Sequence, residues 1–249
     1  GDTPAYHWLS ADIEPTSCQR KHYQISVLLS LLLLEPLSLL LLAHLLSSCA
    51  PIQPGSQDTQ ALPERIVRQG FSFKPPDEKG WLLPTSGRIS DVALIRRGDD
   101  PDESSVIRAS LSKAPELAVG IALSKSMAAS GYDTSTFITK GLAEIVRETT
   151  KSADPVRYKG IRVEIVPHLK KDSDCVKRQL TYEDNAPVRS SGKKDPMLFE
   201  SLALFCTHPN DKIVLVMVEY SHRYIPGQSD PRFLEKAMNV LNSIEFAAL

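Results

Sequence analysis

The sequence predicts an α+β fold in which helices cover an antiparallel sheet. Three observations lead to this prediction: strand-like runs fill the first half of the domain, a stretch with helical periodicity follows, and four further strands precede a C-terminal helix. The folded part is expected to run from residue 64 to residue 249. At about 185 residues it is long enough to bury one substantial hydrophobic core.

The first half of the domain consists of short apolar segments separated by turn residues. Strand-like runs occur at Phe71 to Lys74, Trp81 to Leu83, Ile89 to Arg96 and Val106 to Leu111. The next segment, Leu117 to Leu123, alternates like a strand but continues into Ala, Lys and Met, which favour a helix. The sequence does not decide between a strand and a helix for that segment.

Helical periodicity is clear in two later segments. Asp133 is expected to cap a helix whose apolar positions share one face, namely Ile138, Leu142, Ile145 and Val146. Asp230 and Pro231 are expected to begin a C-terminal helix with the apolar stripe Phe233, Leu234, Ala237, Met238 and Leu241. Between these helices, four strands are expected at Ile161 to Val166, Val176 to Tyr182, Leu198 to Phe205 and Ile213 to Tyr220.

Charge is balanced over the whole chain. Its 29 Lys and Arg side chains stand against 30 Asp and Glu side chains, for a formal net charge of -1, and 42% of the residues are hydrophobic. This composition is typical of a globular protein and supplies no cationic field that would attract nucleic acid. We therefore expect no nucleic-acid partner.

The most apolar part of the sequence ends at a cysteine. Arg20 and Lys21 precede an almost unbroken apolar block, Ile25 to Leu46, which closes with Leu-Ser-Ser-Cys ending at Cys49. A basic flank, an apolar stretch and small residues before a cut site are typical of a signal peptide. The last four residues resemble the lipobox of bacterial lipoproteins, in which the cysteine thiol takes a diacylglyceryl group and becomes the new N-terminus. We expect Cys49 to be lipidated and to anchor the protein in a membrane.

A retained transmembrane helix and an ordinary cleaved signal are the alternatives to a lipoprotein signal. The block is long enough to span a bilayer, but Glu35 near its middle would cost roughly 2.5 to 3.5 kcal/mol in that position. Residues 1–49 are thus expected to be an N-terminal extension and signal peptide, and residues 50–63, rich in Pro, Gln and Ser, a flexible tether. Ala50 after the cysteine resembles the residues that imply outer-membrane sorting, with the domain facing the periplasm.

Two cysteines of the folded part are predicted to form a disulfide. Cys175 lies near the start of one expected strand and Cys206 at the end of the next, with the polar stretch Ser190 to Lys194 midway between them. A hairpin that turns there places the cysteines opposite each other, and disulfides persist outside the cytoplasm. Two unpaired buried thiols are the alternative. A catalytic cysteine that works with nearby His208 is the least favoured alternative, because no third orienting group is evident.

Neither the histidines nor the acidic residues of the domain have the spacing of a metal site. The histidines that follow the tether are His168, His208 and His222, and they match no zinc signature. An acidic cluster lacks the spacing and the glycine of a calcium loop; its members are Asp99, Asp100, Asp102 and Glu103. Polar strand ends and a solvated loop explain both sets. Glycine-rich phosphate loops are missing too, so we expect no metal and no cofactor.

An enzyme centre has one weak candidate in this sequence. Ser221, His222 and Arg223 follow an apolar strand and could line a pocket at its end. A nucleophilic serine would need a sharp elbow such as G-x-S-x-G, which the sequence lacks. We therefore expect no catalytic residue, and an extracytoplasmic hydrolase is kept as the alternative.

The two ends of the domain resemble a known family. Gly70 to Pro75, Gly80 and Trp81 at the start, and Leu241 to Phe246 at the end, resemble the PsbP-like α/β/α domains of photosystem accessory proteins and many bacterial lipoproteins. The resemblance covers most of residues 70–246 and implies a binding or accessory domain, with no functional residues to carry over. The expected function is a non-enzymatic envelope lipoprotein that binds a protein partner or small ligand at the membrane surface. A structural envelope component is a further alternative.

Overall fold

The computed structural model describes the folded part of the chain. The described residues are 62–83, 92–100, 102–134, 136–151, 154–185, 192 and 195–249. The chain divides into two units, residues 1–58 and 59–249, and all described residues belong to the second. Cys49, the signal segment and most of the tether lie outside the described residues, so their predicted roles stay predictions.

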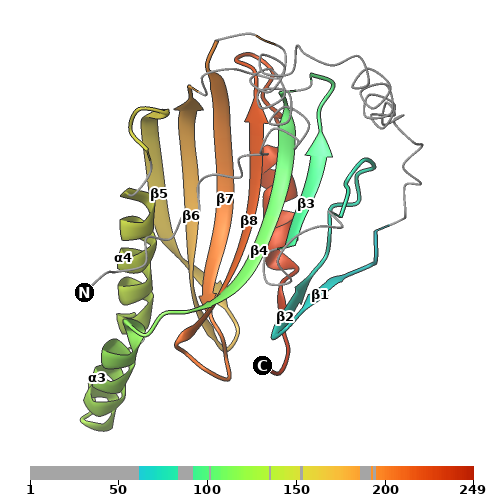
Figure 1. Cartoon of the computed structure of the whole chain (residues 1–249). Coiled ribbons are helices and arrows are strands. Elements are labelled where there is room, and N and C mark those ends of the chain that lie inside the picture. The colour runs from blue at the N-terminus through green and yellow to red at the C-terminus, as the bar shows by residue number, and fades with distance from the viewer. Residues whose placement is uncertain are drawn as a thin grey trace, which may run out of the picture. The chain divides into compact units, whose positions relative to one another are not determined.

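A six-stranded antiparallel sheet forms the centre of the domain, with the order β3-β4-β8-β7-β6-β5 (Figure 1). Its strands are β3 (Val92–Arg97), β4 (Ser104–Lys113), β5 (Tyr158–Lys170), β6 (Ser173–Asp184), β7 (Met197–Thr207) and β8 (Val214–Tyr224). Strands β5 to β8 pair in succession, and β8 then pairs with β4. The four strands predicted for the second half are confirmed, and each is longer than its apolar run.

A second, three-stranded sheet joins the two ends of the domain. Its strands are β1 (Ile66–Arg68), β2 (Phe71–Phe73) and β9 (Glu245–Phe246), in the order β1-β2-β9. Gly70 occupies the β1–β2 turn with φ +77°, a conformation that side chains with a Cβ rarely adopt. Its carbonyl accepts a hydrogen bond from Ala247 N at 2.9 Å, which extends the pairing beyond β9.

Helices pack on both faces of the six-stranded sheet. The described helices are α3 (Leu117–Ala129), α4 (Phe137–Lys151) and α5 (Phe233–Asn242). α4 packs against β5 and β6, whereas α5 packs against β7 and β8 on the opposite face. We call these the α4 face and the α5 face; Figure 1 views the sheet from the α4 face. The predicted α+β class, an antiparallel sheet covered by helices, is confirmed.

Strand alternation gives each face its own hydrophobic cluster. The α5 face holds the larger cluster, which includes Phe71, Phe73, Trp81, Ile107, Leu204, Val218, Tyr220, Phe233 and Leu241. The α4 face holds a smaller one, built from Ala114, Leu117, Leu142, Val146, Val176 and Leu215. Neighbouring residues such as Cys175 and Val176 belong to different clusters, because successive strand residues point to opposite faces. Most of the core therefore lies under α5.

The structure settles the open segment and corrects two details of the helices. Leu117–Ala129 is helical, not a strand. The next helix begins at Phe137, four positions after Asp133, and the Phe137 backbone N–H donates to Thr134 O at 3.0 Å. Leu234 is half exposed and leaves the predicted stripe of α5, where Val240 is buried instead. Within the described residues, no helix combines the length and hydrophobicity needed to span a bilayer.

Candidate functional site

Strand alternation separates the members of the candidate Ser221–His222–Arg223 centre. Ser221 of β8 lies opposite Ser201 of β7 on one side and Val106 of β4 on the other. Its Oγ donates to Val106 O at 3.2 Å. His222, the next residue, points to the α5 face, so no hydrogen bond joins the serine to the imidazole. A Ser–His catalytic pair is therefore not formed by these residues.

His222 lies instead between two carboxylates on the α5 face. Its Nε2 is 3.4 Å from Glu103 Oε1, and its Nδ1 is 3.6 Å from Glu200 Oε1. The ring stacks on Tyr224 with a centroid distance of 4.8 Å and is itself buried. This arrangement can pair a protonated imidazole with two acids, but it offers no nucleophile.

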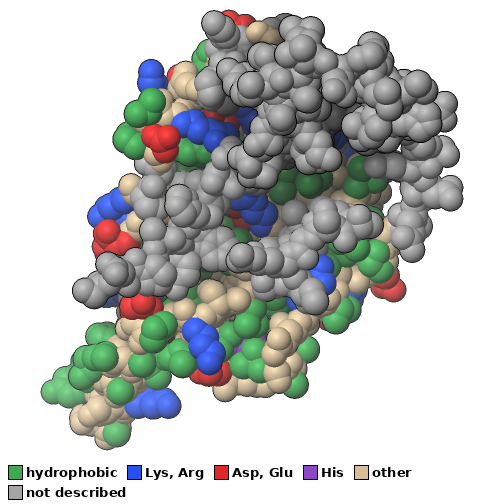
Figure 2. Space-filling view, viewed as in Figure 1, with side chains coloured by type: hydrophobic (Ala, Val, Ile, Leu, Met, Phe, Trp, Pro, Cys, Tyr) green, Lys and Arg blue, Asp and Glu red, His purple; other side chains and the backbone are tan. Residues whose placement is uncertain are grey.

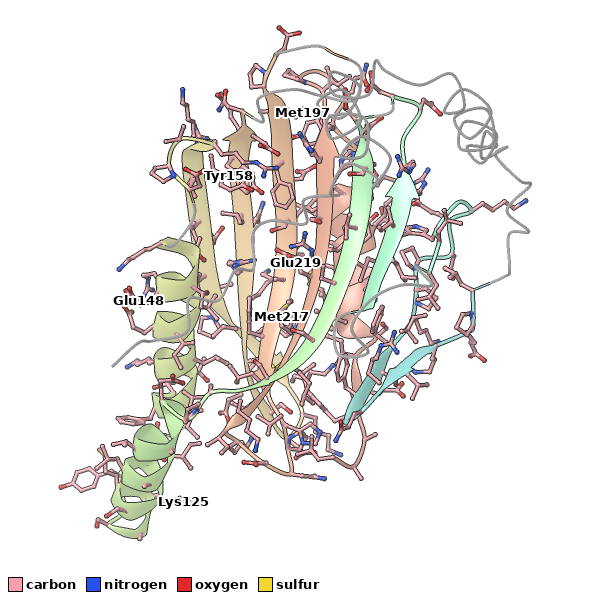
Figure 3. All side chains as sticks on the ribbon, in the orientation of Figure 1. Lys125, Glu148, Tyr158, Met197, Met217 and Glu219 are labelled. Carbon is pink, nitrogen blue, oxygen red and sulfur yellow. A yellow bond between two sulfur atoms is a disulfide. The ribbon has the colours of Figure 1, made fainter. Side chains whose placement is uncertain are left out.

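The α4 face carries a set of buried polar side chains beside α4. We call Arg178, Ser201, Glu219 and Ser221 the polar cluster; they come from β6, β7 and β8 and share one face by register. Arg178 Nη2 donates to Glu219 Oε1 at 2.7 Å, and Nη1 reaches Thr150 Oγ1 of α4 at 3.4 Å. Figure 3 shows Glu219 near the middle of the sheet. A charge pair within the sheet is thus largely shielded from water, and the Arg178–Thr150 hydrogen bond ties it to α4.

Two donors of the polar cluster lack an acceptor within the described structure. Arg178 Nε and Ser201 Oγ are buried and make no hydrogen bond there. Buried polar groups are nearly always hydrogen-bonded, and leaving one without a partner costs roughly 1 to 3 kcal/mol. The guanidinium of Arg178 also lies 5.2 Å above the ring centroid of Phe205, which fixes its plane. The cluster therefore holds two buried donors whose hydrogen-bonding capacity is not used within the described structure.

An aromatic group borders the polar cluster toward one end of the strands. Tyr182 stacks on Phe199 with a centroid distance of 4.4 Å, and Tyr158 meets Tyr182 edge-on at 4.7 Å. Burial of its hydroxyl, and then the nearby Tyr158, raises the pKa of Tyr182 far above its ordinary value. The phenol thus stays protonated. Asp184 accepts a hydrogen bond from Arg157 Nε at 2.9 Å and lies 3.3 Å from Arg223 Nε, so arginines gather at this end.

The two cysteines of the domain are bonded on the α5 face. Cys175 and Cys206 are directly opposite in the β6–β7 pair, with a Cα–Cα distance of 4.1 Å and a Cys175–Cys206 disulfide. The pairing expected from the hairpin is present in the structure. Cys206 in this form is no nucleophile, which removes the cysteine–histidine alternative.

His208 has a structural role. Asn210 N donates to its Nδ1 at 3.2 Å, so Nδ1 is the acceptor and Nε2 carries the proton that is donated to Gly70 O at 2.9 Å. The fully buried ring therefore ties the end of β7 to the β1–β2 turn. Both ring nitrogens are satisfied, and His208 has no free atom for catalysis.

The remaining sequence candidates also take structural positions. His168 lies on edge strand β5, where partial burial, followed by Lys177 and Lys170, lowers its pKa. The acidic cluster forms the β3–β4 turn, closed by a hydrogen bond from Gly98 N to Glu103 O at 3.0 Å. Across the described ranges, no group of His, Cys, Asp and Glu has the geometry of a metal site.

The polar cluster was not found from the sequence, although a signal for it exists. Arg178 stands between Val176 and Leu180, which share its face of β6 and are buried. Glu219 holds the equivalent inward position in β8. A charged side chain at a buried position of an apolar strand is rare unless it is paired with an opposite charge. Each of these two residues therefore indicates a buried partner. Only the sheet order shows that the two are partners.

Comparisons with known proteins add no assignment to this geometry. No protein-family model matches the sequence, and no curated protein matches it. Among solved structures, the chain is similar to the human StarD13 (DLC2) lipid transfer and protein localization domain, with 10% identity over 67% of this chain and 85% of that domain. The TM-score of 0.25 is too low to support an argument about fold or function.

Proposed function

We propose that this protein is a non-enzymatic envelope lipoprotein whose domain binds a partner or small ligand on the α4 face. The observation that carries the proposal is the polar cluster, where buried Arg178 Nε and Ser201 Oγ lack acceptors in the described structure. A bound carboxylate, phosphate or backbone carbonyl would supply them. The split of Ser221 and His222 between two faces speaks against the hydrolase alternative.

The family part of the proposal is a PsbP-like domain. Its support is the layering, in which α4 lies on one face of an antiparallel sheet and α5 on the other, as an α/β/α domain requires. The terminal segments that carry the resemblance form one small sheet, where Phe71 pairs with Phe246. An accessory domain of this kind needs a binding surface and no catalytic group.

A crosslinking experiment tests binding on the α4 face. A photoreactive amino acid replaces Met217, which is half-buried on the α4 face of β8, in the full chain in a bacterial host. The matched control places the same amino acid at Lys177, half-buried on the α5 face of β6. We expect crosslinked products from position 217 and not from position 177. Products from position 177 alone, or from neither position, contradict the proposal.

The lipid anchor is tested separately at Cys49. Metabolic labelling with a fatty-acid analogue should mark the wild type and leave Cys49→Ala unlabelled, because the thiol is the site of attachment. Two acyl chains anchor a protein stably, at about 0.8 kcal/mol per buried methylene, whereas one chain is marginal. Mass spectrometry should place the mature N-terminus at residue 49. Equal labelling of both forms, or another N-terminus, would show that the lipoprotein part is wrong.

A further inference from the structure

α3 exposes apolar side chains that a helix in water normally buries. Val119, Leu123 and Met127 lie four residues apart and form one stripe along the helix, with 69%, 51% and 38% of their surfaces exposed. Tyr132, 66% exposed, follows the helix, and its N–H donates to Met127 O at 3.1 Å. We call these four residues the α3 patch. Figure 2 shows hydrophobic side chains gathered on this projecting helix at the lower left.

The neighbouring helix shows how this protein builds a surface that faces water. The exposed side of α4 carries two ion pairs one turn apart, Glu144 with Arg147 and Glu148 with Lys151. α3 packs against α4 but buries only Leu117 and Ser124. The side of α3 that faces away from α4 has no comparable ion pairs, so exposure of its apolar side chains to water is unfavourable.

The composition of α3 identifies a lipid surface as its partner. Lys125 is the only ionisable residue within the helix, so the stripe itself carries no carboxylate, and Glu116 and Asp133 lie beyond its two ends. Small residues flank the stripe, namely Ala118, Ala122 and Ser126, whereas protein-docking surfaces usually have a polar rim. A tyrosine at the end of the stripe is typical of the membrane interface, because its ring is apolar and its hydroxyl polar.

The length of α3 determines how it would meet the bilayer. Thirteen residues span about 20 Å at 1.5 Å per residue, less than the hydrocarbon core of about 30 Å. The helix is thus too short to cross and suits the headgroup region. Cys49 and Leu62, the first described residue, are 13 positions apart, which limits their separation to about 45 Å.

We propose that the α3 patch inserts into the membrane surface and holds the domain against the bilayer. The inference rests on the proposed function only for the nearness of a membrane, because the patch itself needs no acyl chain. A lipid at Cys49 and the α3 patch are two separate contacts. Together they would orient the domain, which a single point of attachment does not.

Vesicle binding tests the patch in the absence of any acyl chain. The protein is a chain that starts at residue 49 with Cys49→Ser, which retains the whole unit of residues 59–249. The probe is vesicles of equal parts phosphatidylethanolamine and phosphatidylglycerol, measured by cosedimentation. Leu123→Glu should lower the affinity about tenfold or more, because a buried leucine and a buried charge differ by at least that factor. Leu169→Glu is the matched control, since Leu169 is 98% exposed on β5.

The outcomes separate the patch from its alternatives. Binding that Leu123→Glu weakens and Leu169→Glu preserves, with equal melting temperatures, supports the proposal. Failure of the parent chain to bind vesicles overturns it, as does equal binding of both variants. A parent chain that dimerises in solution without binding vesicles assigns the patch to a second copy instead. Vesicle binding without labelling at Cys49 would leave this inference standing while the proposed anchor fails.

Fluorescence gives a second measurement that does not depend on weakening the patch. Tyr132→Trp should shift its emission to shorter wavelength when vesicles are added, because the indole enters a less polar environment. Val156→Trp is the control, since Val156 is 79% exposed in a turn before β5. An equal shift at both positions, or none at position 132, contradicts insertion through the α3 patch.

Discussion

The two faces of the six-stranded sheet differ in what they bury. Under α5, a large apolar cluster joins both sheets, and the Cys175–Cys206 bond lies within it. Under α4, the apolar cluster is small, and the same strands bury the Arg178–Glu219 pair. The adjoining α3 leaves its apolar side exposed. Apart from His222 and its carboxylates, the α5 face therefore has the features of a core, whereas the α4 face combines a small core with a buried charge pair and an exposed apolar helix.

This difference teaches how stabilising residues can be separated from residues that have another role. Residues that raise stability are apolar, buried and mutually packed, as Phe233 and Tyr220 are on the α5 face. Residues that lower it, such as a buried charge or an exposed valine, need another reason to be present. The comparison of the faces thus yields ordered expectations for mutagenesis.

The largest effect is expected on the α5 face, from Phe233→Ala. The ring is buried and packs edge-on against Tyr220 at 5.6 Å, so its removal should lower the free energy of unfolding by about 3 to 5 kcal/mol. Urea denaturation measures the change. Leu234→Ala is the matched control on the same helix, and should cost less than about 1 kcal/mol because Leu234 is half exposed. Equal losses would remove the distinction between core and surface on α5.

The next effect tests the buried charge on the α4 face. Glu219→Ala leaves the Arg178 guanidinium without its carboxylate and should cost about 3 kcal/mol, the lower end for a buried pair. Adding Arg178→Met should recover much of this loss, because no uncompensated charge then remains. If the double variant is no more stable than Glu219→Ala, the charge pair is not the origin of the loss. Crosslinking from position 217 in the double variant would show whether binding survives.

The disulfide is expected to contribute somewhat less. Cys175 and Cys206 are 31 positions apart, and closing such a loop stabilises by about 2 to 3 kcal/mol after allowance for residual structure in the unfolded chain. Replacing both residues with Ala should lower the urea midpoint accordingly, and reduction of the parent should have a similar effect. Free thiols at both positions in protein isolated from its host without reductant would contradict a native bond.

The smallest effect concerns the start of α5 and depends on pH. Burial raises the pKa of Asp230, but hydrogen bonds from Lys236 Nζ and Arg232 N outweigh it and leave the pKa below its ordinary value of 3.8. A depressed pKa stabilises the fold above the unfolded value, and this contribution is lost as pH falls through the folded value. Asp230→Asn should cost less than about 1 kcal/mol at neutral pH.

A pH series of urea denaturation measures this last effect. The wild type and Asp230→Asn should differ at about pH 6, and the difference should shrink as pH falls through the depressed folded-state pKa, below which the carboxyl is protonated in both folded and unfolded states. A difference that is constant across this range would mean that the ion pair does not account for it.

The sequence predicted the parts of this fold that depend on local alternation. The strands from β5 to β8 and the helix after Asp230 each carry a period that only one secondary structure satisfies. α3 could not be assigned in this way, because its large apolar residues alternate as in a strand from Leu117 to Leu123, while the Ala, Lys and Met that follow favour a helix. In the structure, hydrogen bonds from Leu117 N to Ala114 O and from Ala118 N to Pro115 O form the first turn.

The polar cluster depends on information that is not local. Arg178 and Glu219 are 41 positions apart in the sequence. They meet across β7, where both are register partners of Ala203. No residue near either one specifies that order. Ser221 and His222 show the opposite case, because the alternation of a strand already implies that neighbours point to different faces.

The pairing of β2 with β9 sets the order in which the domain can be completed. Phe71 pairs with Phe246, and Arg65 donates to Ser243 O at 2.8 Å, so the β1–β2 hairpin completes its sheet with a segment about 175 positions later in the sequence. The hairpin therefore cannot close this sheet on the ribosome until β9 has been synthesised. Because a contact over such a separation costs loop-closure entropy, the small sheet is expected to form after the local pairings of β5 to β8.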